Sequence, residues 1–422
     1  MQPVDIVILA NGPGEVATWV RPTVRSLRRQ LGDDRASVRI SLILSPCPHA
    51  TGKEAAIARS YPQIDRVQDP QNFWPFLLSG KTAESWEWRS RGVVLFLGGD
   101  QFFTLVVAKR LGYRSIIYAE WEARWVPWVD RFALMKPEIG RRVRAKYRPK
   151  LTTIGDLIAE VAADVRESPN VSENNTVELI GLLPGSKPAK LAQGVPLCLA
   201  IAEILARKRP QTHFVIPVAP SLDLDTIARF ADPARNPLLS RFGTRGAQLE
   251  RSPEGEPQFL TETGVRIRLH TASPAYDLLV RCRLCLTTVG ANTAELGALG
   301  VPMLVLLPTQ QLDAMRAWDG LPGLLANLPL VGTGLAKIIN GWVLRQGRLF
   351  AWPNIWANRE IVPELVGVLE PSAVAREAIA LLEDPERLEQ MRDRLKALRG
   401  KAGAADALAT VVRDELEKTE AN

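Results

Sequence analysis

The chain has 422 residues, and this length predicts two domains rather than one. Its 46% hydrophobic and 23% charged residues are ordinary for a globular protein, which excludes a collagen-like, low-complexity or coiled-coil chain. The net charge of +7 suits anionic partners such as phosphates or anionic lipid, although a solubility charge spread over two domains explains it equally well.

Cysteine usage and hydropathy narrow the class of protein further. The four Cys lack paired spacing, so we expect reduced thiols and no metal site. The N-terminus does not look like a signal peptide, and no run reaches the roughly 18 to 20 uncharged apolar residues that span a bilayer. We therefore expect a cytoplasmic protein, or one bound peripherally to the inner membrane. Tryptophans cluster beside arginines, which is typical of membrane interfaces, with buried core Trp as the alternative.

Strands and helices alternate over residues 1–165. The expected strands are 4–9, 38–44, 93–97, 115–118 and 131–135, and the expected helices are 18–31 and 103–111. The turn Ala10–Glu15 holds two glycines around a proline, so its backbone can approach a ligand closely. The third strand ends in Gly98-Gly99-Asp100. This alternation predicts a Rossmann-like, doubly wound domain.

A polar, aperiodic stretch, Val165–Thr176, is the expected linker to a second domain at 177–370. The expected strands of this domain are 177–183, 213–218, 265–269, 284–288 and 301–307, and the expected helices are 189–208, 275–280 and 293–299. Residues 232–257 look like a loop-rich insertion. A charged helix pair is expected over Glu370–Glu417.

The segment Thr309–Val343 is unusual because its central part, 320–335, has no acid or base and is broken by two prolines. An exposed apolar patch of this kind would indicate contact with membrane or lipid. A helix pair packed in the core is an equally weighted alternative.

Two loops of the second domain have the composition of a phosphate or nucleotide site. In Pro184–Lys187 a strand ends in Gly-Ser before a helix, which offers free backbone N–H groups, and Lys187 adds a point charge. An ordinary β-to-α turn is the alternative, and the spacing is not that of a P-loop. The second loop, around Gly290, lies in a strand–loop–helix–strand unit, and parallel sheets bind ligands at the carboxyl ends of their strands. Glu295 could accept hydrogen bonds from ribose hydroxyls, or form a capping box with Asn292.

Four sequence blocks resemble bacterial lipid-A-disaccharide synthases, GT-B glycosyltransferases that join two acylated glucosamine units with a UDP-sugar donor. The blocks are Gly14-Glu15, Leu182–Lys187 (LLPGSK), Gly290–Met303 (GANTAELGALGVPM) and Pro353–Glu360 (PNIWANRE). Phe96–Asp100 (FLGGD) is a further match. The resemblance extends over roughly residues 4–400.

The resemblance implies an α/β fold of the GT-B type, with two Rossmann-like doubly wound domains facing across a cleft. The amino-terminal domain would hold the acceptor and the carboxy-terminal domain the UDP-sugar. C-terminal helices at 371–422 would pack back on the domains.

The resemblance also implies roles for individual residues. Gly185, Ser186 and Lys187 would face the donor diphosphate. Gly290, Asn292, Thr293 and Glu295 would hold the uridine end, and Asn354, Arg359 and Glu360 would line the donor cleft. Asp100 would be the general base, and Gly14 and Glu15 would lie on the acceptor or phosphate side.

This chemistry is that of an inverting hexosyltransferase. One carboxylate deprotonates the acceptor hydroxyl, and cationic or N–H groups stabilise the charge that builds on the leaving diphosphate. We expect neither a cofactor nor a metal, since GT-B enzymes usually meet the second need with protein groups. Asp100 has a structural alternative, because an Asp after Gly-Gly often caps the next helix.

Departures from the family pattern concentrate on the acceptor side, in residues 17–19 and 101–104. In the donor loop, Lys187 replaces an Arg and Lys190 replaces an acid. The pattern favours a UDP-sugar enzyme at the membrane face with a different lipid-like acceptor. The alternatives are a catalytically inactive relative that binds nucleotide sugar or lipid, and a UDP-sugar 2-epimerase. Nucleic-acid binding ranks below these, because the basic residues form no single stripe. Oligomerisation stays open.

Overall fold

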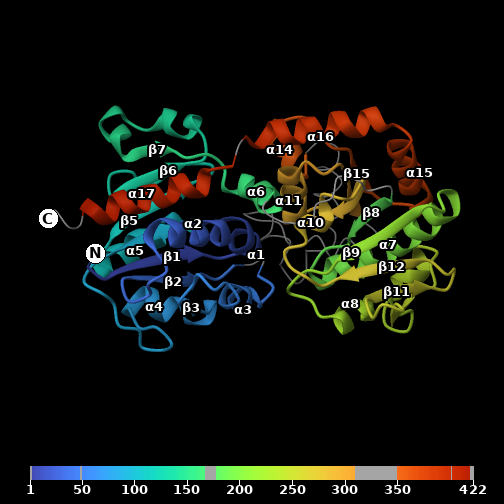
Figure 1. Cartoon of the computed structure of the whole chain (residues 1–422), viewed down its shortest axis with the longest axis horizontal. Helices are drawn as coiled ribbons and strands as arrows, with labels where there is room; N and C mark the ends of the chain where they lie inside the picture. The colour runs from blue at the N-terminus through green and yellow to red at the C-terminus, as the bar shows by residue number, and fades with distance from the viewer. Residues whose placement is uncertain (1, 48–49, 167–176, 309–348, 401, 419–422) are drawn as a thin grey trace, which may run out of the picture. The chain divides into compact units, whose positions relative to one another are not determined.

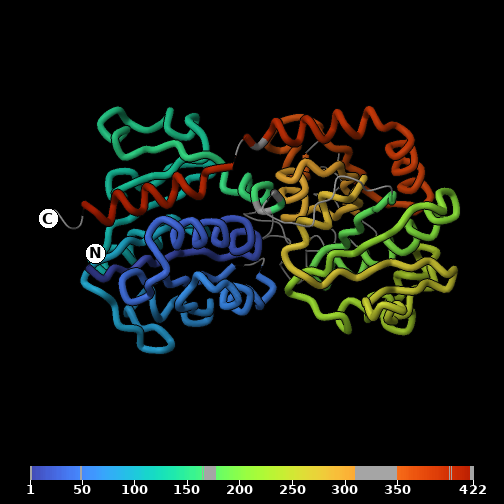
Figure 2. The backbone as a smooth tube through the Cα atoms, viewed as in Figure 1, coloured from blue at the N-terminus to red at the C-terminus, as the bar shows by residue number. Residues whose placement is uncertain are grey.

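The computed structural model describes residues 2–47, 50–166, 177–308, 349–400 and 402–418. The chain folds into two compact units, residues 1–163 with 400–422, and residues 164–399. Figures 1 and 2 show that each unit is built around a sheet with helices packed on it. The apolar segment Thr309–Val343 and most of the expected linker Val165–Thr176 lie outside the described residues.

The first unit is built on a parallel sheet with the strand order β3-β2-β1-β4-β5-β6-β7. Its strands are β1 (Val4–Ala10), β2 (Val38–Leu44), β3 (Arg66–Gln68), β4 (Gly92–Phe96), β5 (Arg114–Ala119), β6 (Arg131–Leu134) and β7 (Leu151–Thr153). Every residue of the central strand β1 is buried, as expected for a parallel strand covered on both faces.

Helices cover both faces of this sheet. They are α1 (Pro13–Glu15), the π-helical segment η1 (Val16–Val20), α2 (Arg21–Leu31), α3 (Glu54–Arg59), η2 (Pro70–Asn72), α4 (Phe73–Ser79), α5 (Gln101–Leu111), η3 (Pro137–Arg142), η4 (Ala145–Lys150), η5 (Leu157–Ala159), α6 (Glu160–Arg166) and α17 (Ala404–Lys418). Ile6 and Ile8 pack in the core that holds α2 and α17, whereas Val7 and Leu9 pack in the core that holds α4 and α5. This alternation follows from the two-residue period of side chains along a strand.

The last helix, α17, belongs to the first unit although it ends the chain. Its buried Leu408 and Val412 join the core on the α2 face of the sheet. Glu415 is 1% exposed, and its carboxylate forms an ion pair with Arg114 of β5 at 2.6 Å. The preceding helices α15 and α16 stay with the second unit, so the C-terminal helical segment is divided between the two units.

The second unit is built on a sheet with the order β10-β11-β12-β9-β8-β13-β14-β15. Its strands are β8 (Glu178–Leu183), β9 (Thr212–Pro217), β10 (Ala247–Arg251), β11 (Pro257–Thr261), β12 (Arg266–His270), β13 (Leu284–Thr288), β14 (Met303–Pro308) and β15 (Glu364–Gly367). Its helices are α7 (Pro188–Lys208), α8 (Leu224–Ala231), α9 (Leu238–Arg241), α10 (Tyr276–Leu279), α11 (Ala291–Leu299), α14 (Trp352–Ala357), α15 (Pro371–Leu382) and α16 (Pro385–Arg399). The pairs β10–β11 and β11–β12 are antiparallel, and the other pairs are parallel.

Three sequence expectations need correction. Residues 232–257 are not all loop, because β10 lies there and pairs with β11; this edge strand is largely exposed, so it lacks the apolar run that identified the inner strands. The helix expected from residue 18 begins at Pro13, since a proline is well tolerated in the first turn of a helix. The expected C-terminal helix pair is three helices.

Helix α7 has the length and hydropathy of a membrane span, but 72% of the apolar window is buried inside the protein. Its apolar side chains, among them Leu197 and Ile201, belong to the core of the second unit. The apolar residues of α7 therefore pack inside the protein.

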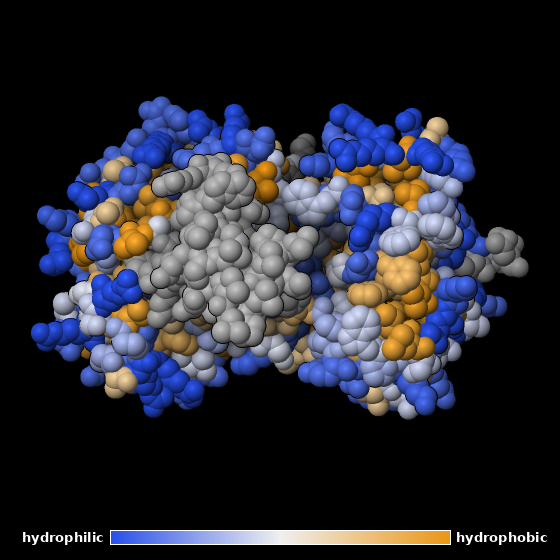
Figure 3. Space-filling model, turned by 180° about the vertical axis from the view of Figure 1, so that it is seen from behind, coloured by the Kyte–Doolittle hydropathy of each residue, from blue (hydrophilic) through white to orange (hydrophobic). Residues whose placement is uncertain are grey.

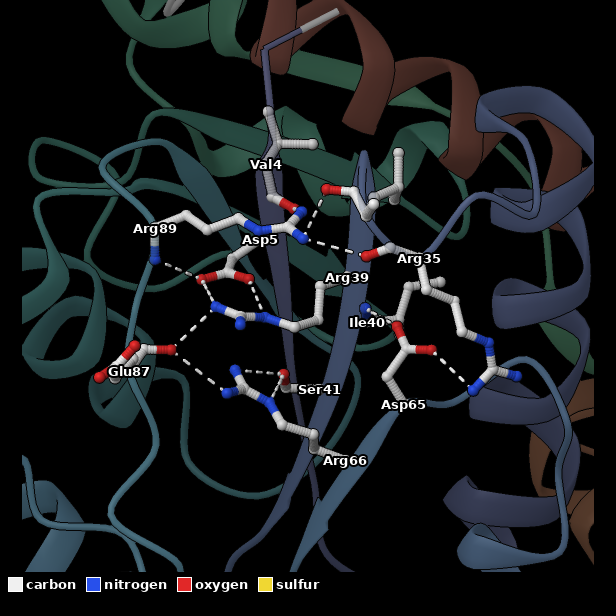
Figure 4. Close-up of polar contacts among 12 residues, drawn as sticks. Val4, Asp5, Arg35, Arg39, Ile40, Ser41, Asp65, Arg66, Glu87 and Arg89 are labelled. Atoms are coloured by element: carbon white, nitrogen blue, oxygen red, sulfur yellow. Dashed lines mark hydrogen bonds and ion pairs between the residues drawn. The ribbon is translucent and has the colours of Figure 1, made fainter.

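A buried charge network ties the amino-terminal end of the first sheet together (Figure 4). Asp5 on β1 is 0% exposed and accepts from Arg39 at 2.7 and 2.9 Å. It also accepts from the backbone N–H of Arg89 and from the Tyr113 hydroxyl, each at 2.8 Å. Arg66 lies over the ring of Trp86 at 4.4 Å, and burial, together with Arg39, lowers the pKa of Arg66 to about 10. The network lies at the end of β1 opposite to the loop that follows it, so we assign it to stability.

Candidate functional site

Each sheet has two adjacent central strands whose following connections lead toward opposite edges of the sheet. The first sheet runs outward from β1 to β2 and β3 and then returns to β4, beside β1. The second runs from β8 to β9 and outward, and then returns to β13, beside β8. Ligands of open α/β sheets bind in the crevice at the carboxyl ends of such neighbouring strands. The loops after β1 and β4, and after β8 and β13, are therefore the candidate sites.

In the first unit, the side chain of Glu15 lies against Gly12, near the start of the loop that follows β1. A Cβ added to Gly12 would lie 2.3 Å from Oε2 of Glu15, and one added to Gly98 would lie 3.1 Å from Cγ of Glu15. A side chain at either position would therefore have to displace Glu15. Half-buried Gly14 lies in α1, and its carbonyl accepts from Thr18 at 2.8 Å. The structure thus brings Glu15 to the loop that carries Asp100.

Asp100 caps helix α5, which confirms the structural alternative. Its Oδ1 accepts from the backbone N–H of Phe102 at 2.9 Å and from Nη2 of Arg124 at 3.1 Å. Both contacts use the same oxygen, and among the described residues Oδ2 accepts no hydrogen bond. The side chain is 47% exposed. A cap on one oxygen therefore leaves the second oxygen free to take up a proton.

The loop that supplies Arg124 is joined to the Asp100 turn and carries exposed aromatic rings. Gln101 donates to the carbonyl of Glu122 and accepts from the backbone N–H of Arg124, each at 2.9 Å. An aromatic surface follows, which we define as Phe102, Trp121, Trp125 and Trp128. Phe102 and Trp125 have ring centroids 5.3 Å apart, and Trp125 and Trp128 are 6.0 Å apart.

The aromatic surface is open to solvent, with Trp128 67% exposed. Figure 3 shows hydrophobic side chains gathered on the first unit, at the right of that view. Two hollows flank the rings, of about 710 Å³ and about 510 Å³. The larger is lined by Trp121 and Trp125 together with Lys136, Arg142 and Arg144, although Glu122 and Glu138 also line it. Large exposed apolar groups of this kind mark sites of interaction.

In the second unit, Lys190 of α7 bridges the two glycine loops. Its Nζ donates to the carbonyl of Val289 at 2.6 Å. A Cβ added to Gly290 would lie 3.2 Å from Nζ, and one added to Gly185 would lie 2.9 Å from Cβ of Lys190. Gly185 has φ +102°, a conformation that favours glycine. The structure therefore brings together the two loops that the sequence singled out separately.

Ser186 and Lys187 complete the first of these loops, and both are half-buried. Lys187 stands at the N-cap position of α7 in an extended conformation and makes no side-chain cap. Loss of water and repulsion from Lys187 lower the pKa of Lys190 to about 8, even though the Lys190 side chain retains exposed surface.

The capping-box interpretation of the second loop is wrong. Helix α11 begins at Ala291 with Gly290 as its N-cap, and no side chain caps it. Asn292 and Glu295 therefore stand inside the helix, too far along for the box. Thr293 instead accepts from the backbone N–H of Trp352 at 3.1 Å and donates to the carbonyl of Gly290 at 2.8 Å, which ties the loop to α14.

Glu295 is a half-buried acid on α11, and among the described residues no hydrogen bond or ion pair engages its carboxylate. Burial raises the pKa of Glu295 to about 7. An acid held in this state gains from a partner that donates hydrogen bonds to its ionised form.

The Pro353–Glu360 block does not act as one surface. Asn354 is 0% exposed, donates to Val362 O at 2.8 Å and to Oε1 of Glu364 at 2.6 Å, and accepts from the backbone N–H groups of Ile361 and Val362. These four bonds use both amide protons and both lone pairs of the oxygen. Asn354 is therefore a structural clamp rather than a ligand contact. Arg359 and Glu360, by contrast, are exposed.

Lys190, Arg124 and Glu364 take part in these arrangements, and the sequence analysis assigned no site role to any of them. Glu364 on β15 accepts from the backbone N–H groups of Phe350 and Ala351 at the start of α14. Only Lys190 left a signal, as a second lysine three residues after Lys187. Among the described residues, no group of three or more His, Cys, Asp or Glu could hold a metal ion, and none of the four Cys forms a disulfide there.

Comparison with known proteins finds distant sequence relatives that are named lipid-A-disaccharide synthases. No family model matches the chain. A lipid-A-disaccharide synthase of Persephonella marina is 24% identical over 241 residues, which cover 56% of this chain and 50% of the relative. One from Geobacter metallireducens is 23% identical over 335 residues, covering 74% of this chain and 71% of the relative. The chain spans about half the length of the first curated relatives it matches.

Solved structures resemble the whole chain. S. aureus MnaA, in a co-structure with UDP, aligns with a TM-score of 0.52 at 11% identity, covering 99% of this chain and 97% of that one. The UDP-GlcNAc 2-epimerase of Neisseria meningitidis, bound to UDP-GlcNAc, aligns with a TM-score of 0.51 at 15% identity, covering 98% and 100%. At these identities the likeness concerns the fold alone. The chain has the α/β GT-B fold, and its sequence is similar to those of lipid-A-disaccharide synthases.

Proposed function

We propose that this divergent relative of the lipid-A-disaccharide synthases is an inverting hexosyltransferase that moves a sugar from a UDP-sugar to a lipid or lipid-like acceptor at the membrane face. One observation carries the proposal. The two loops that resemble the family's donor loops meet at the strand reversal of the second sheet, where Lys190 joins Val289 to the Gly185 turn. Such a position is where open α/β sheets bind nucleotides.

On the donor side, the Gly185–Lys187 turn would bind the diphosphate through backbone N–H groups and the Lys187 ammonium. Gly290, Asn292 and Thr293 would form the floor under the uridine end. Glu295 would accept from the ribose hydroxyls, which suits an acid that no described residue engages. Exposed Arg359 and Glu360 would line the entrance.

On the acceptor side, Asp100 would act as general base. Its Oδ2 would take the proton of the acceptor hydroxyl while the hydroxyl oxygen bonds to the sugar carbon and the bond to the diphosphate breaks. The cap and the Arg124 pair on Oδ1 would hold the carboxylate in one orientation. Glu15, which packs against the Gly98 loop, would bind a polar group of the acceptor or phosphate.

The aromatic surface supports a lipid-like acceptor and contact with a membrane. Trp and Phe rings suit acyl chains and the bilayer interface, and the basic residues of the larger hollow suit anionic headgroups. The loop that carries the rings is hydrogen-bonded to the Asp100 turn, so a lipid seated there would lie close to the proposed base.

UDP binding tests the donor assignment. A ligand that binds only the native state adds about 2.7 kcal/mol of stability at 100 times its Kd, so UDP should raise the melting temperature. Glu295→Ala should abolish this shift, whereas Glu389→Ala, which removes an exposed acid on α16, should not. If neither UDP nor any UDP-sugar shifts the unaltered protein, the donor assignment is wrong.

Product analysis separates this function from its alternatives. The protein is incubated with a panel of UDP-sugars and a total lipid extract, and a new glycolipid with release of UDP is the expected result. An epimerase would conserve the mass of the donor. An inactive relative would form no product, and Asp100→Ala would leave its biological role intact.

A further inference from the structure

Lys190 occupies a position that loop packing alone does not require. Its stem lies against Gly185 and its ammonium against Gly290, on loops that follow two neighbouring strands. The ammonium uses one of its three donors on Val289 O. Among the described residues no carboxylate pairs with Lys190. Two donors of a positive group are therefore left without a partner among the described residues.

A second lysine lies close to Lys190. Lys187 is close enough to repel it, and this repulsion acts together with loss of water on the ammonium. Lys187 is the N-cap of α7 and Lys190 lies in its first turn, and Lys190 also lies beside the N-terminal end of α11. Helix N-termini disfavour cations and favour anions. Without an anion, this arrangement costs stability.

We propose that Lys190 is a second diphosphate-binding cation of the donor site, which acts with Lys187 on the leaving group of the UDP-sugar. The inference rests on the proposed function and adds a residue to it. An anion at the junction of the two loops would relieve the repulsion between the lysines and accept the remaining donors of Lys190. Lysine suits this task because the two protons that the bond to Val289 leaves over can reach oxygens on both phosphates.

The alternative is that Lys190 only ties the two loops through Val289. If Lys190 only holds the two loops together, it supports the whole pocket, and its loss would weaken uridine binding and UDP binding alike. A diphosphate contact would weaken UDP binding and spare uridine. The ratio of the two affinities therefore distinguishes the roles.

Calorimetric titrations with UDP and with uridine test this on the full chain. The variants are Lys190→Met, Lys190→Arg and the control Lys208→Met, which removes an exposed lysine in the last turn of the same helix, about 27 Å away at 1.5 Å per residue. We expect Lys190→Met to weaken UDP binding at least tenfold with little change for uridine. Lys190→Arg should retain UDP affinity within threefold, and Lys208→Met should match the unaltered protein.

Three results would overturn the inference. The first is a Lys190→Met protein that binds UDP within twofold of the unaltered protein. The second is an equal loss of UDP and uridine binding, which would assign Lys190 to the tie. In both cases the proposed function survives. In the third, the unaltered protein binds no UDP at all, and the donor assignment fails together with the inference. Melting curves of each variant without ligand show whether it is folded.

Discussion

Asn354 gives the sharpest test of the structure against the family resemblance. If the side chain is a clamp, Asn354→Ala leaves the backbone N–H groups of Ile361 and Val362 without their acceptor, and the carbonyl of Val362 without its donor. Each buried unsatisfied group costs about 1 to 3 kcal/mol. Allowing for partial relaxation, we expect a loss of about 3 to 5 kcal/mol in the free energy of unfolding of the second unit.

A urea titration followed by circular dichroism measures the change, with the slope of the transition as a check that the same surface unfolds. Hydrogen exchange of residues 350–367 locates the loss, because local opening there should rise first. Arg359→Ala is the control, since this exposed side chain should change stability by no more than about 0.5 kcal/mol. Weakened UDP binding by Asn354→Ala with stability within about 1 kcal/mol of the unaltered protein would refute the clamp and restore the ligand contact.

Four further outcomes follow from the geometry. Since burial raises the pKa of Glu295 from 4.5 to about 7, the stability gained from its protonated form is full below pH 4.5 and is lost as pH rises through 7. Glu295→Gln should remove this dependence, worth about 1 to 3 kcal/mol for a half-buried group, in melts between pH 4.5 and 8. Asp100→Asn should lower kcat at least about 100-fold, the usual scale of general-base catalysis, with UDP binding unchanged by calorimetry. Replacing Trp125 and Trp128 together by Ser should weaken binding to anionic vesicles at least about tenfold in a sedimentation assay. Asp5→Ala should cost about 3 to 5 kcal/mol in urea unfolding, because it removes the buried carboxylate that pairs with half-buried Arg39.

Each outcome has a matched control or a contrary result. If Glu295→Gln leaves the pH dependence of stability unchanged, the raised pKa of Glu295 is contradicted. Asp100→Asn at full activity would remove Asp100 as the base. Val368→Ser changes another exposed apolar position and should leave vesicle binding intact. If this variant loses as much vesicle binding as the double Trp variant, the aromatic surface has no specific role. Arg29→Ala, which removes an exposed ion-pair partner of Asp406, should change urea stability far less than Asp5→Ala does.

Local sequence pattern was sufficient for the buried inner strands and for the order of the two units. Runs such as Val4–Ala10 and Val38–Leu44 are apolar because parallel strands are buried on both faces, and this burial can be read from neighbouring residues alone. The same pattern missed short or amphipathic elements. Strand β10 at a sheet edge and helix α14 with Pro353 in its first turn carry no continuous apolar run.

The candidate site divides along the same line. Loop composition singled out the turns at Gly185 and Gly290, because glycine between a strand and a helix is a local feature, and the family resemblance added Asp100. The tertiary structure alone decided the partners. Lys190 reaches Val289 across 99 positions in the sequence, and Asp100 pairs with Arg124 across 24. The side chain of Asn354 is buried, and it donates to the carboxylate of Glu364 on β15. Hydrophobic periodicity specifies which residues are buried, whereas the partner of a polar side chain depends on which strands the chain path places side by side.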